Sequence, residues 1–407
     1  MGACSSQRRR ILFEDGPSQM VTFTIGLQGR RVTVPLKQIP DSGEGEPLNG
    51  EWEKVSCSGE MPCERSGHAV IVAQGKAYLF GGYGGANPCH LSDFYSFDFA
   101  KGAWETVRAP GGPCPRTAFA MCVTPDDFVY LWGGTDHDLQ GLEDQELYEY
   151  DVYNSRWSLV DTVNKGILDL RYFGRSASYY KRKILYFGGG VKGGRFTNEL
   201  IQLDLDSFRW ERVPTTGDLP CPRYKHQACV VGDRLYVLGG GCYLPPEETL
   251  DVYCLDLTTR VWAKVGAAAA AADGGGELPE GRAAHTCEYD AATGALYLWG
   301  GFNQGLVPLF DFWRLDLRTH QWARAAPRDA ADKPGAAWPG RSFHAACLHG
   351  GALYSFNGSD GESRYADLMR FRLHAAPAPL VDLALGALKR ADGAALARRL
   401  RRQALRA

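Results

Sequence analysis

Short hydrophobic runs recur along the chain, and each ends in a pair of glycines. Five such pairs begin at Gly81, Gly133, Gly188, Gly239 and Gly300, and a weaker sixth copy is Asn357-Gly358. The intervals between them are 52, 55, 51, 61 and 57 residues. A tryptophan follows each of the first five pairs by 22 to 24 residues, at Trp104, Trp157, Trp210, Trp262 and Trp322. This register predicts a repeated unit of four short antiparallel strands.

The two ends of the repeat region complement each other. Trp52 lies in a short strand, residues 51–55, that has no repeat before it, whereas the sixth repeat stops after its third strand, residues 367–373. We predict that the N-terminal strand adds to the last repeat and closes a ring, because closure removes the exposed edges of the sheets. The expected fold class is all-β: a six-bladed β-propeller over residues 51–373, followed by a short C-terminal helical tail.

An arginine opens the first strand of each repeat, at Arg65, Arg116, Arg175, Arg223, Arg282 and Arg341. Two interpretations stay open. The arginines satisfy backbone carbonyls between blades, or they form a cationic ring that binds a carboxylate or a phosphate. They share one edge of the sheets with the longest connections, so we assign ligand recognition to this loop face. The candidate ligand-binding residues are Lys192, Arg195, Arg223, Tyr224, Lys225, Arg341 and Ser342.

The repeat resembles the kelch repeat, whose period is about 50 residues. The likeness extends over residues 51–373, with segments such as 218–220, 223–226, 236–241 and 311–317. Together with the helical tail, these segments are similar to the kelch-domain substrate receptors of elongin-cullin ubiquitin ligases. The resemblance implies a receptor that binds short C-terminal peptides of client proteins on the loop face, while its partners supply the catalysis.

The tail changes character from residue 377 onward, where helix formers dominate. Leu380, Ala384 and Leu388 are spaced four residues apart and lie on one apolar helix face. They resemble an elongin BC box, although the small residue is usually cysteine. The resemblance implies that elongin B/C binds here and a cullin binds the next helix, which lacks the Leu-Pro often found there. Alternatively, both helices pack on the propeller, or the basic residues after Gly386 contact anionic lipid.

The N-terminus carries a lipidation pattern. Gly2 and Cys4 lie in a Met-Gly-x-x-x-Ser sequence, which predicts myristate on Gly2 and palmitate on Cys4; a chance match is the alternative.

Residues 20–36 predict a β-hairpin. The expected organisation is an acylatable basic segment at 1–19, a hairpin and linker at 20–50, the propeller at 51–373 and the helical tail at 374–407.

Composition narrows the function classes. The chain has 45 Lys and Arg against 47 Asp and Glu, which argues against binding nucleic acid through bulk positive charge. No apolar run approaches the ~18 residues of a membrane helix. The 12 cysteines form no Cys-x-x-Cys pair, and the histidines show no ligand spacing, so we expect no metal and no cofactor. A catalytic triad and a P-loop are absent from the sequence, so we do not expect an enzyme.

The predicted function is therefore a protein-binding propeller that serves as the substrate receptor of an elongin-cullin ubiquitin ligase. One alternative is a membrane-tethered kelch scaffold without a ligase role, and a weaker one is a kelch enzyme. We expect client proteins, elongin B/C, a cullin and, through acylation, a membrane as partners. The expected location is the cytoplasm, with membrane association through the N-terminus, or alternatively the nucleus.

Overall fold

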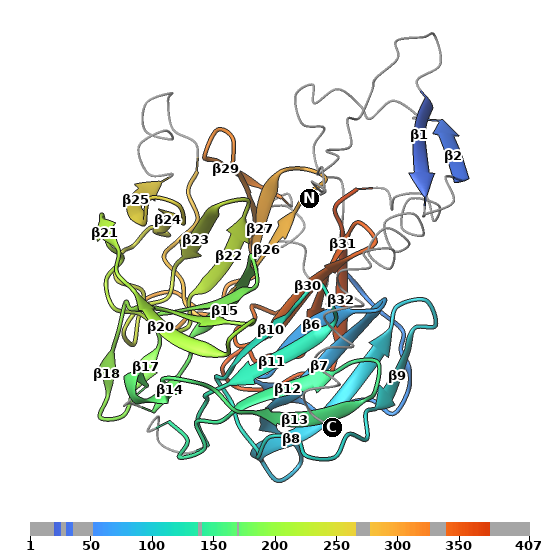
Figure 1. Ribbon diagram of the computed structural model, residues 1–407, viewed down its shortest axis with the longest axis horizontal. Coiled ribbons are helices and arrows are strands. Elements are labelled where there is room, and N and C mark those ends of the chain that lie inside the picture. The colour runs from blue at the N-terminus through green and yellow to red at the C-terminus, as the bar shows by residue number, and fades with distance from the viewer. Residues whose placement is uncertain are drawn as a thin grey trace, which may run out of the picture. The chain divides into compact units, whose positions relative to one another are not determined.

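The computed structural model describes the backbone of two strands at residues 20–25 and 30–35, and residues 52–136, 141–168, 171–265, 277–325 and 339–374 (Figure 1). Contacts divide the chain into two units. In the first, β1 (Met20–Ile25) and β2 (Arg30–Pro35) pair as an antiparallel hairpin. The second, Leu48–Asp382, holds the other described strands. Among the described residues, no helix is long and apolar enough to cross a membrane.

The second unit repeats a sheet of four antiparallel strands. The first sheet has β6 (Ala69–Ala73), β7 (Lys76–Gly84), β8 (Cys89–Asp98) and β9 (Ala103–Thr106). The second has β10 (Ala120–Val123), β11 (Phe128–Trp132), β12 (Leu147–Asp151) and β13 (Arg156–Val160). The third has β15 (Ser176–Tyr180), β16 (Lys183–Phe187), β19 (Leu200–Asp204) and β20 (Arg209–Val213).

The remaining sheets follow the same order. The fourth has β22 (Gln227–Val231), β23 (Arg234–Leu238), β24 (Val252–Asp256) and β25 (Val261–Val265). The fifth has β26 (Thr286–Asp290), β27 (Ala295–Trp299), β28 (Phe312–Asp316) and β29 (Gln321–Arg324). The last has β30 (Ala345–His349), β31 (Ala352–Phe356), β32 (Leu368–Arg372) and, from the start of the unit, β3 (Trp52–Lys54). The fold is thus all-β with antiparallel sheets, as the repeat predicted.

Short extra strands border these sheets. At their outer edges, β4 (Ser58–Gly59) and β21 (Thr216–Gly217) pair in parallel with β9 and β25. At the loop face, β5 (Arg65–Ser66) extends the pairing with β7. The third sheet has a small neighbour made of β14 (Tyr172–Phe173), β17 (Gly190–Val191) and β18 (Arg195–Phe196). A single 3₁₀ turn, η1 (Lys165–Ile167), is the helical element of the described residues.

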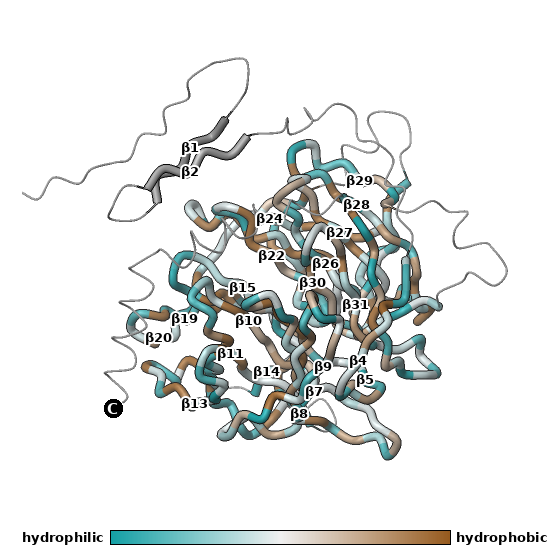
Figure 2. Tube along the Cα trace, turned by 90° about the vertical axis from the view of Figure 1, so that its right-hand side faces the viewer, coloured by the Kyte–Doolittle hydropathy of each residue, from teal (hydrophilic) through white to brown (hydrophobic). Residues whose placement is uncertain are grey.

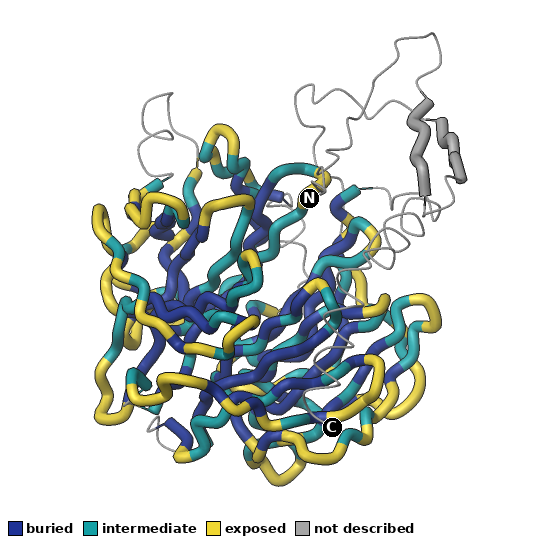
Figure 3. The backbone as a smooth tube through the Cα atoms, viewed as in Figure 1, coloured by how far each residue is buried: buried dark blue, intermediate teal, exposed yellow. Residues whose placement is uncertain are grey.

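The first strand of each sheet lies innermost. Consecutive first strands contact one another, and β30 contacts β6; Figure 1 shows these strands gathered around the middle of the unit. The core lies between neighbouring sheets, as where Trp104 of β9 meets Phe356 of β31 with ring centroids 5.9 Å apart. Hydrophobic stretches follow the strands in Figure 2, and Figure 3 shows the strands as buried and the turns as exposed.

The strand at the start of the unit joins its end. In β3, Trp52 pairs with Phe371 of β32, and the two rings lie 5.5 Å apart. Trp52 also contacts Trp299 of β27 at 4.4 Å. Four repeat tryptophans, Trp104, Trp157, Trp210 and Trp262, are fully buried, whereas Trp52 and Trp322 are half-buried. Residues at the two ends of the unit therefore share one sheet and one aromatic cluster.

Backbone hydrogen bonds join neighbouring sheets at the loop face. The second residue of a Gly-Gly pair donates its N–H to the carbonyl of the next repeat arginine. This bond runs from Gly82 to Arg116 at 3.0 Å and from Gly240 to Arg282 at 2.9 Å. Gly358 makes the same bond to Arg65 at 2.9 Å, which links the last sheet to the first. Each of these glycines has a positive φ, a conformation that side chains disfavour.

The expectation of an equivalent arginine in every repeat was wrong for the third. Gly134 donates to the carbonyl of Tyr172 at 3.0 Å, so Tyr172 holds the position of the repeat arginine. Arg175 comes three residues later, at the position of His226 in the fourth repeat. Its guanidinium carbon lies 4.0 Å from the centre of the Tyr172 ring. Burial lowers the pKa of Arg175 to about 10.

The buried histidines make the fold sensitive to acid. Burial, with a neighbouring arginine, lowers the pKa of His68, His226 and His285 from 6.5 to about 3. The unfolded chain takes up these protons below about pH 6.5, whereas the folded chain does not. Their contribution to stability is therefore full above pH 6.5 and is lost as the pH falls toward 3.

Each of the three should lower the free energy of unfolding by about 2 kcal/mol between about pH 7.5 and pH 5. Denaturant unfolding of the full chain at the two pH values measures these contributions together with that of His344, whose pKa is also lowered, and that of Glu288, whose pKa burial raises to about 8 and whose contribution has the opposite sign. In His226→Gln, which cannot titrate, the pH dependence should shrink by about 2 kcal/mol. Equal pH dependence in His226→Gln and the wild type would contradict the role of this ring.

Candidate functional site

The repeat arginines at the loop face are interior residues. Arg65, Arg116, Arg223, Arg282 and Arg341 are at most 1% exposed. Each donates to the carbonyl of the first residue of the Gly-Gly pair, or of Asn357, at 2.8 to 3.1 Å. Each also forms an ion pair with an acid that lies one to three residues before the third strand, or within that strand in the first sheet: Asp144, Asp251, Asp311, Asp367 and, within β8, Asp93.

Arg223 is an example of a repeat arginine whose hydrogen-bond donors all have acceptors. It contacts Asp251 at 3.0 and 2.7 Å and the carbonyls of Gly239 and Cys221 at 2.8 and 3.0 Å. A further N–H points at the sulfur of Cys221 at 3.1 Å, so all five donors have acceptors. Burial alone would lower the pKa of Arg223, but the hydrogen bonds and charge of Asp251 raise it. This geometry supports the structural interpretation of the arginines, so we leave Arg223 and Arg341 out of the proposed ligand set.

Six residues form what we call the inner rim, at the start of the innermost strands. They come two residues after the repeat arginine or its substitute and have φ between 52° and 67°: Gly67, Ala118, Gly174, Lys225, Ala284 and Phe343. Hydrogen bonds run from one sheet to the next along them, from Phe343 to Ala284 at 3.0 Å and from Ala284 to Lys225 at 2.9 Å. Left-handed backbone is costly for residues other than glycine and persists where the surroundings enforce it. Lys225 is the charged member of the inner rim.

The Lys225 amine is surrounded by aromatic rings. Its Nζ lies 4.6 Å from the centre of the Tyr224 ring, 5.2 Å from Phe302 and 4.9 Å from Phe343. It forms no ion pair with any residue that the structure describes. Burial lowers its pKa to about 8. A half-buried amine with unused donors is suited to bind a carboxylate or another anion.

An aromatic row connects Lys225 to the hairpin of β17 and β18. Phe196 of β18 lies 4.8 Å from Tyr224 and 5.1 Å from Tyr243, measured between ring centroids. Lys192 and Arg195 are exposed on the same hairpin. These two predicted residues thus lie on the hairpin whose Phe196 contacts Tyr224, which is itself buried. Ser342 is also buried, and its hydroxyl donates to the carbonyl of Ser359 at 3.3 Å.

Exposed apolar residues lie on the two loops that follow β23 and β27. We call them the loop patch: Tyr243, Leu244, Leu306 and Val307, which are 42% to 64% exposed. The two loops touch, because the Gln304 side chain donates to the carbonyl of Pro245 at 3.2 Å. Sequence reasoning missed this patch and also missed Phe302 and Phe343. One signal was present in the sequence, since the patch residues lie three to six residues after a Gly-Gly pair.

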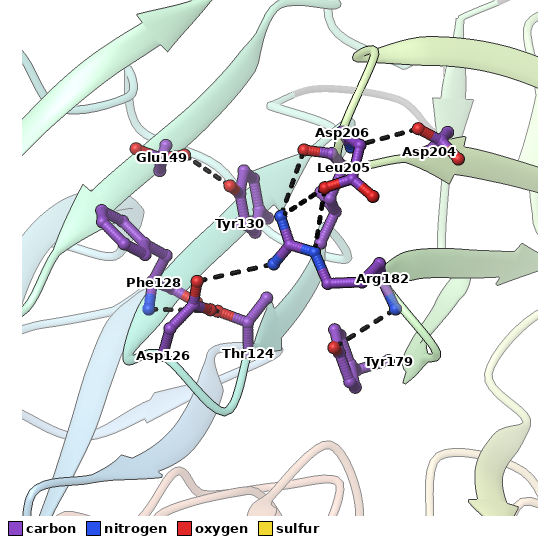
Figure 4. Close-up of polar contacts among 10 residues, drawn as sticks. All are labelled: Thr124, Asp126, Phe128, Tyr130, Glu149, Tyr179, Arg182, Asp204, Leu205 and Asp206. Atoms are coloured by element: carbon purple, nitrogen blue, oxygen red, sulfur yellow. Dashed lines mark hydrogen bonds and ion pairs between the residues drawn. The ribbon is translucent and has the colours of Figure 1, made fainter. Parts of the chain in front are cut away.

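Two cations at the opposite edge of the sheets form ion pairs between sheets. Figure 4 shows Arg182 in the turn after β15, which reaches Asp126 of the second sheet at 3.5 Å and Asp206 of its own sheet at 3.0 Å. Lys181 in the same turn pairs with Asp233 of the fourth sheet at 2.6 Å. At the loop face, neither Lys192 nor Arg195 forms an ion pair with a described residue. Lys192 and Arg195 are therefore available at the loop face to bind a ligand.

The remaining predictions concern lipidation, elongin binding and metal ions. Gly2, Cys4, Leu380, Ala384 and Leu388 are outside the described residues. Within the part of the chain that the structure describes, His, Cys, Asp and Glu side chains form no group of three that could hold a metal ion.

Comparison with known families agrees with this architecture. The model of the Attractin/LZTR1 beta-propeller matches residues 129–364, more than half of the chain. The chain belongs to the kelch-repeat β-propeller family. The KLHDC2/KLHL20/DRC7 Kelch-repeats domain model matches residues 46–166. The likeness to kelch proteins drawn from the sequence is thereby confirmed. Kelch propellers are protein-interaction domains and are typically not catalytic.

Curated relatives share part of their length with this chain. Kelch domain-containing protein 10 of Xenopus tropicalis is 27% identical over 279 residues, which cover 65% of this chain and 65% of that protein. The Homo sapiens protein of the same name is 26% identical over 65% of this chain and 60% of its own length. Acyl-CoA-binding domain-containing protein 5 of Arabidopsis thaliana is 27% identical over 64% of this chain and 41% of its own. The chain thus matches less than two thirds of the length of these relatives.

The buried ion pairs predict a large difference between two arginine substitutions. Arg223→Ala would leave the Asp251 carboxylate buried without a partner, so the free energy of unfolding should fall by about 3–5 kcal/mol. Arg195→Ala at the exposed hairpin is the matched control and should change it by less than about 0.5 kcal/mol. Urea unfolding of the full chain measures both. Equally small effects would contradict a structural role for Arg223.

Proposed function

We propose that this kelch propeller is the substrate receptor of an elongin-cullin ubiquitin ligase and that its loop face binds short C-terminal peptides of client proteins. The observation that carries the peptide part is the Lys225 amine, which has no described ion-pair partner and lies between three aromatic rings. The α-carboxylate of a client would pair with this amine. The residues before the carboxylate would extend along the loop patch, where exposed apolar side chains can be covered.

We infer that the repeated sheets are six blades of one ring closed by the N-terminal strand. The pairing of β3 with β32 supports this arrangement, as does the contact of β30 with β6. The hydrogen bond from Gly358 to Arg65 supports it at the loop face. A closed ring would hold the inner rim in one geometry, so less ordering cost would oppose the binding of a peptide.

The ligase part of the proposal rests on the sequence of the tail. Leu380, Ala384 and Leu388 would dock the helix on elongin B/C, and a cullin would bind next to it. The lipidation pattern at Gly2 and Cys4 favours a second candidate, a membrane-tethered scaffold that uses the same loop face without ubiquitin transfer. Elongin binding separates the two candidates.

The peptide part is tested by a random peptide library displayed with free C-termini. Lys225→Glu should reduce capture by the full chain at least about tenfold, because the new carboxylate would repel that of the peptide. Lys101→Glu, in the exposed turn after β8 at the opposite edge, is the matched control and should leave capture unchanged. Amidated peptides should bind weakly to all three proteins. Unchanged capture by Lys225→Glu would rule out this site.

The ligase part is tested by co-purification of elongin B/C with the full chain. Leu380→Asp should abolish elongin binding, because burying an unpaired charge in the interface costs several kcal/mol. Leu380→Met should retain it, and peptide capture should be the same in both variants. A wild-type chain that captures peptides but no elongin would remove the ligase role and leave the scaffold.

A further inference from the structure

Three repeats carry a cysteine two residues before the arginine, in a Pro-Cys-x-Arg sequence: Cys63, Cys114 and Cys221. In each, Nη2 of the arginine donates to the sulfur, at 3.2, 3.0 and 3.1 Å. The guanidinium thus holds the sulfur in a fixed position next to a positive charge. Reactive cysteines are typically found in such electropositive and partly exposed surroundings.

The fourth repeat differs from the other two because a second cysteine faces this motif. Tyr224 and Gly241 exchange backbone hydrogen bonds at 2.9 and 3.2 Å, which places Cys242 opposite Arg223. The Cys242 thiol donates to the carbonyl of Pro222 at 3.3 Å, and Pro222 is bonded to Cys221. Both cysteines are exposed. Two accessible thiols therefore lie on facing segments.

The first repeat shows the direction in which the thiol of the motif points. There, Arg65 faces Gly84, and the sulfur of Cys63 lies 3.8 Å from the place that a Cβ on Gly85 would occupy. The thiol is thus turned toward the facing segment, which in the first repeat carries no side chains at these positions. In the fourth repeat the same segment carries Cys242. The negative charge of Cys221 also contributes, after burial, to the raised pKa of Cys242, as expected for neighbouring sulfurs.

We propose that Cys221 and Cys242 form a reversible disulfide when the protein meets hydrogen peroxide. The Cys221 sulfur attacks one peroxide oxygen, the O–O bond breaks, and a sulfenic acid and one water form. The Cys242 sulfur then attacks the sulfenic sulfur, forms the S–S bond and releases a second water. The two thiols lose two electrons and the peroxide gains them.

The disulfide would act on the loop patch. Cys242 directly precedes Tyr243 and Leu244, so a covalent bond to Cys221 would fix the start of this loop. Disulfides require Cα atoms about 4.4–6.8 Å apart, and the loop would have to settle into that geometry. An effect on peptide capture rests on the proposed function, whereas formation of the disulfide does not.

The chemistry is tested on the full chain by peroxide treatment, thiol blocking and tryptic digestion without reduction. We expect a cross-link between peptides 213–223 and 235–260, with fragment ions that place it on Cys242 and not on the buried Cys254. Dithiothreitol should reverse it. Cys114 is the internal control, because Arg116 donates to its sulfur in the same way at 3.0 Å and residues 133–146, from the second Gly-Gly pair to β12, contain no cysteine. It should end as a sulfenic acid that dimedone traps.

The variant Cys242→Ser should raise dimedone labelling of Cys221 at least about tenfold over the wild type, because nothing then resolves the sulfenic acid. A cross-link of Cys221 to Cys254, to Cys63 or to a second chain would overturn the proposal, and so would oxidation of Cys221 without any cross-link. Peptide capture by the oxidised wild type and by oxidised Cys242→Ser is compared separately. A cross-link without a change in capture would overturn only the effect on the loop patch.

Discussion

An ion pair between a buried arginine and a carboxylate organises the repeats of this fold, and the third repeat has a variant of it. In the fourth repeat, Arg223 ties the start of the first strand to the Gly-Gly turn and to Asp251 before the third strand. Neither charge is tolerated alone in the interior, because an unpaired buried charge costs several kcal/mol. The three segments must therefore assemble together, and the loops that leave them start from fixed positions. In the third repeat, Arg175 stacks on Tyr172 and pairs with the partly buried Glu199 at 3.6 Å, from a position three residues further along the chain.

These ion pairs also determine which cations are free to bind a ligand. The repeat arginines are buried and ion-paired in the interior, and Arg182 and Lys181 at the opposite edge form ion pairs between sheets. Lys225 differs because its backbone is held in the inner rim while its amine lies among aromatic rings. Next to it, the loop patch offers apolar surface on loops held by a rigid scaffold. Charge and apolar area together on one face are what a short peptide with a free carboxylate needs.

Much of the fold could be predicted from the sequence because its signals are local and repeated. The Gly-Gly pairs and the tryptophans fixed the strand order and the edge with the long loops. The acids that pair with the arginines lie 26 to 29 residues after them. This regular spacing could have predicted the ion pairs from the sequence. Arg175 was wrongly assigned to the position of the repeat arginine, because the presence of an arginine does not fix the alignment of one repeat with the next. Tyr172, three residues earlier, holds that position. The surroundings of Lys225 could not be predicted, because Phe302 and Phe343 come from distant parts of the chain and meet it only in the folded protein.

The most direct measurement is the affinity of one library-selected peptide with a free C-terminus for the full chain, between about pH 6.5 and pH 9.5. The Lys225 amine must be protonated to attract the carboxylate, and its pKa in the free protein is about 8. We expect constant affinity below pH 8 and a fall of about tenfold per pH unit above it, until the pKa of the ion-paired amine is reached. An affinity that stays unchanged up to about pH 9.5 would contradict carboxylate recognition by Lys225.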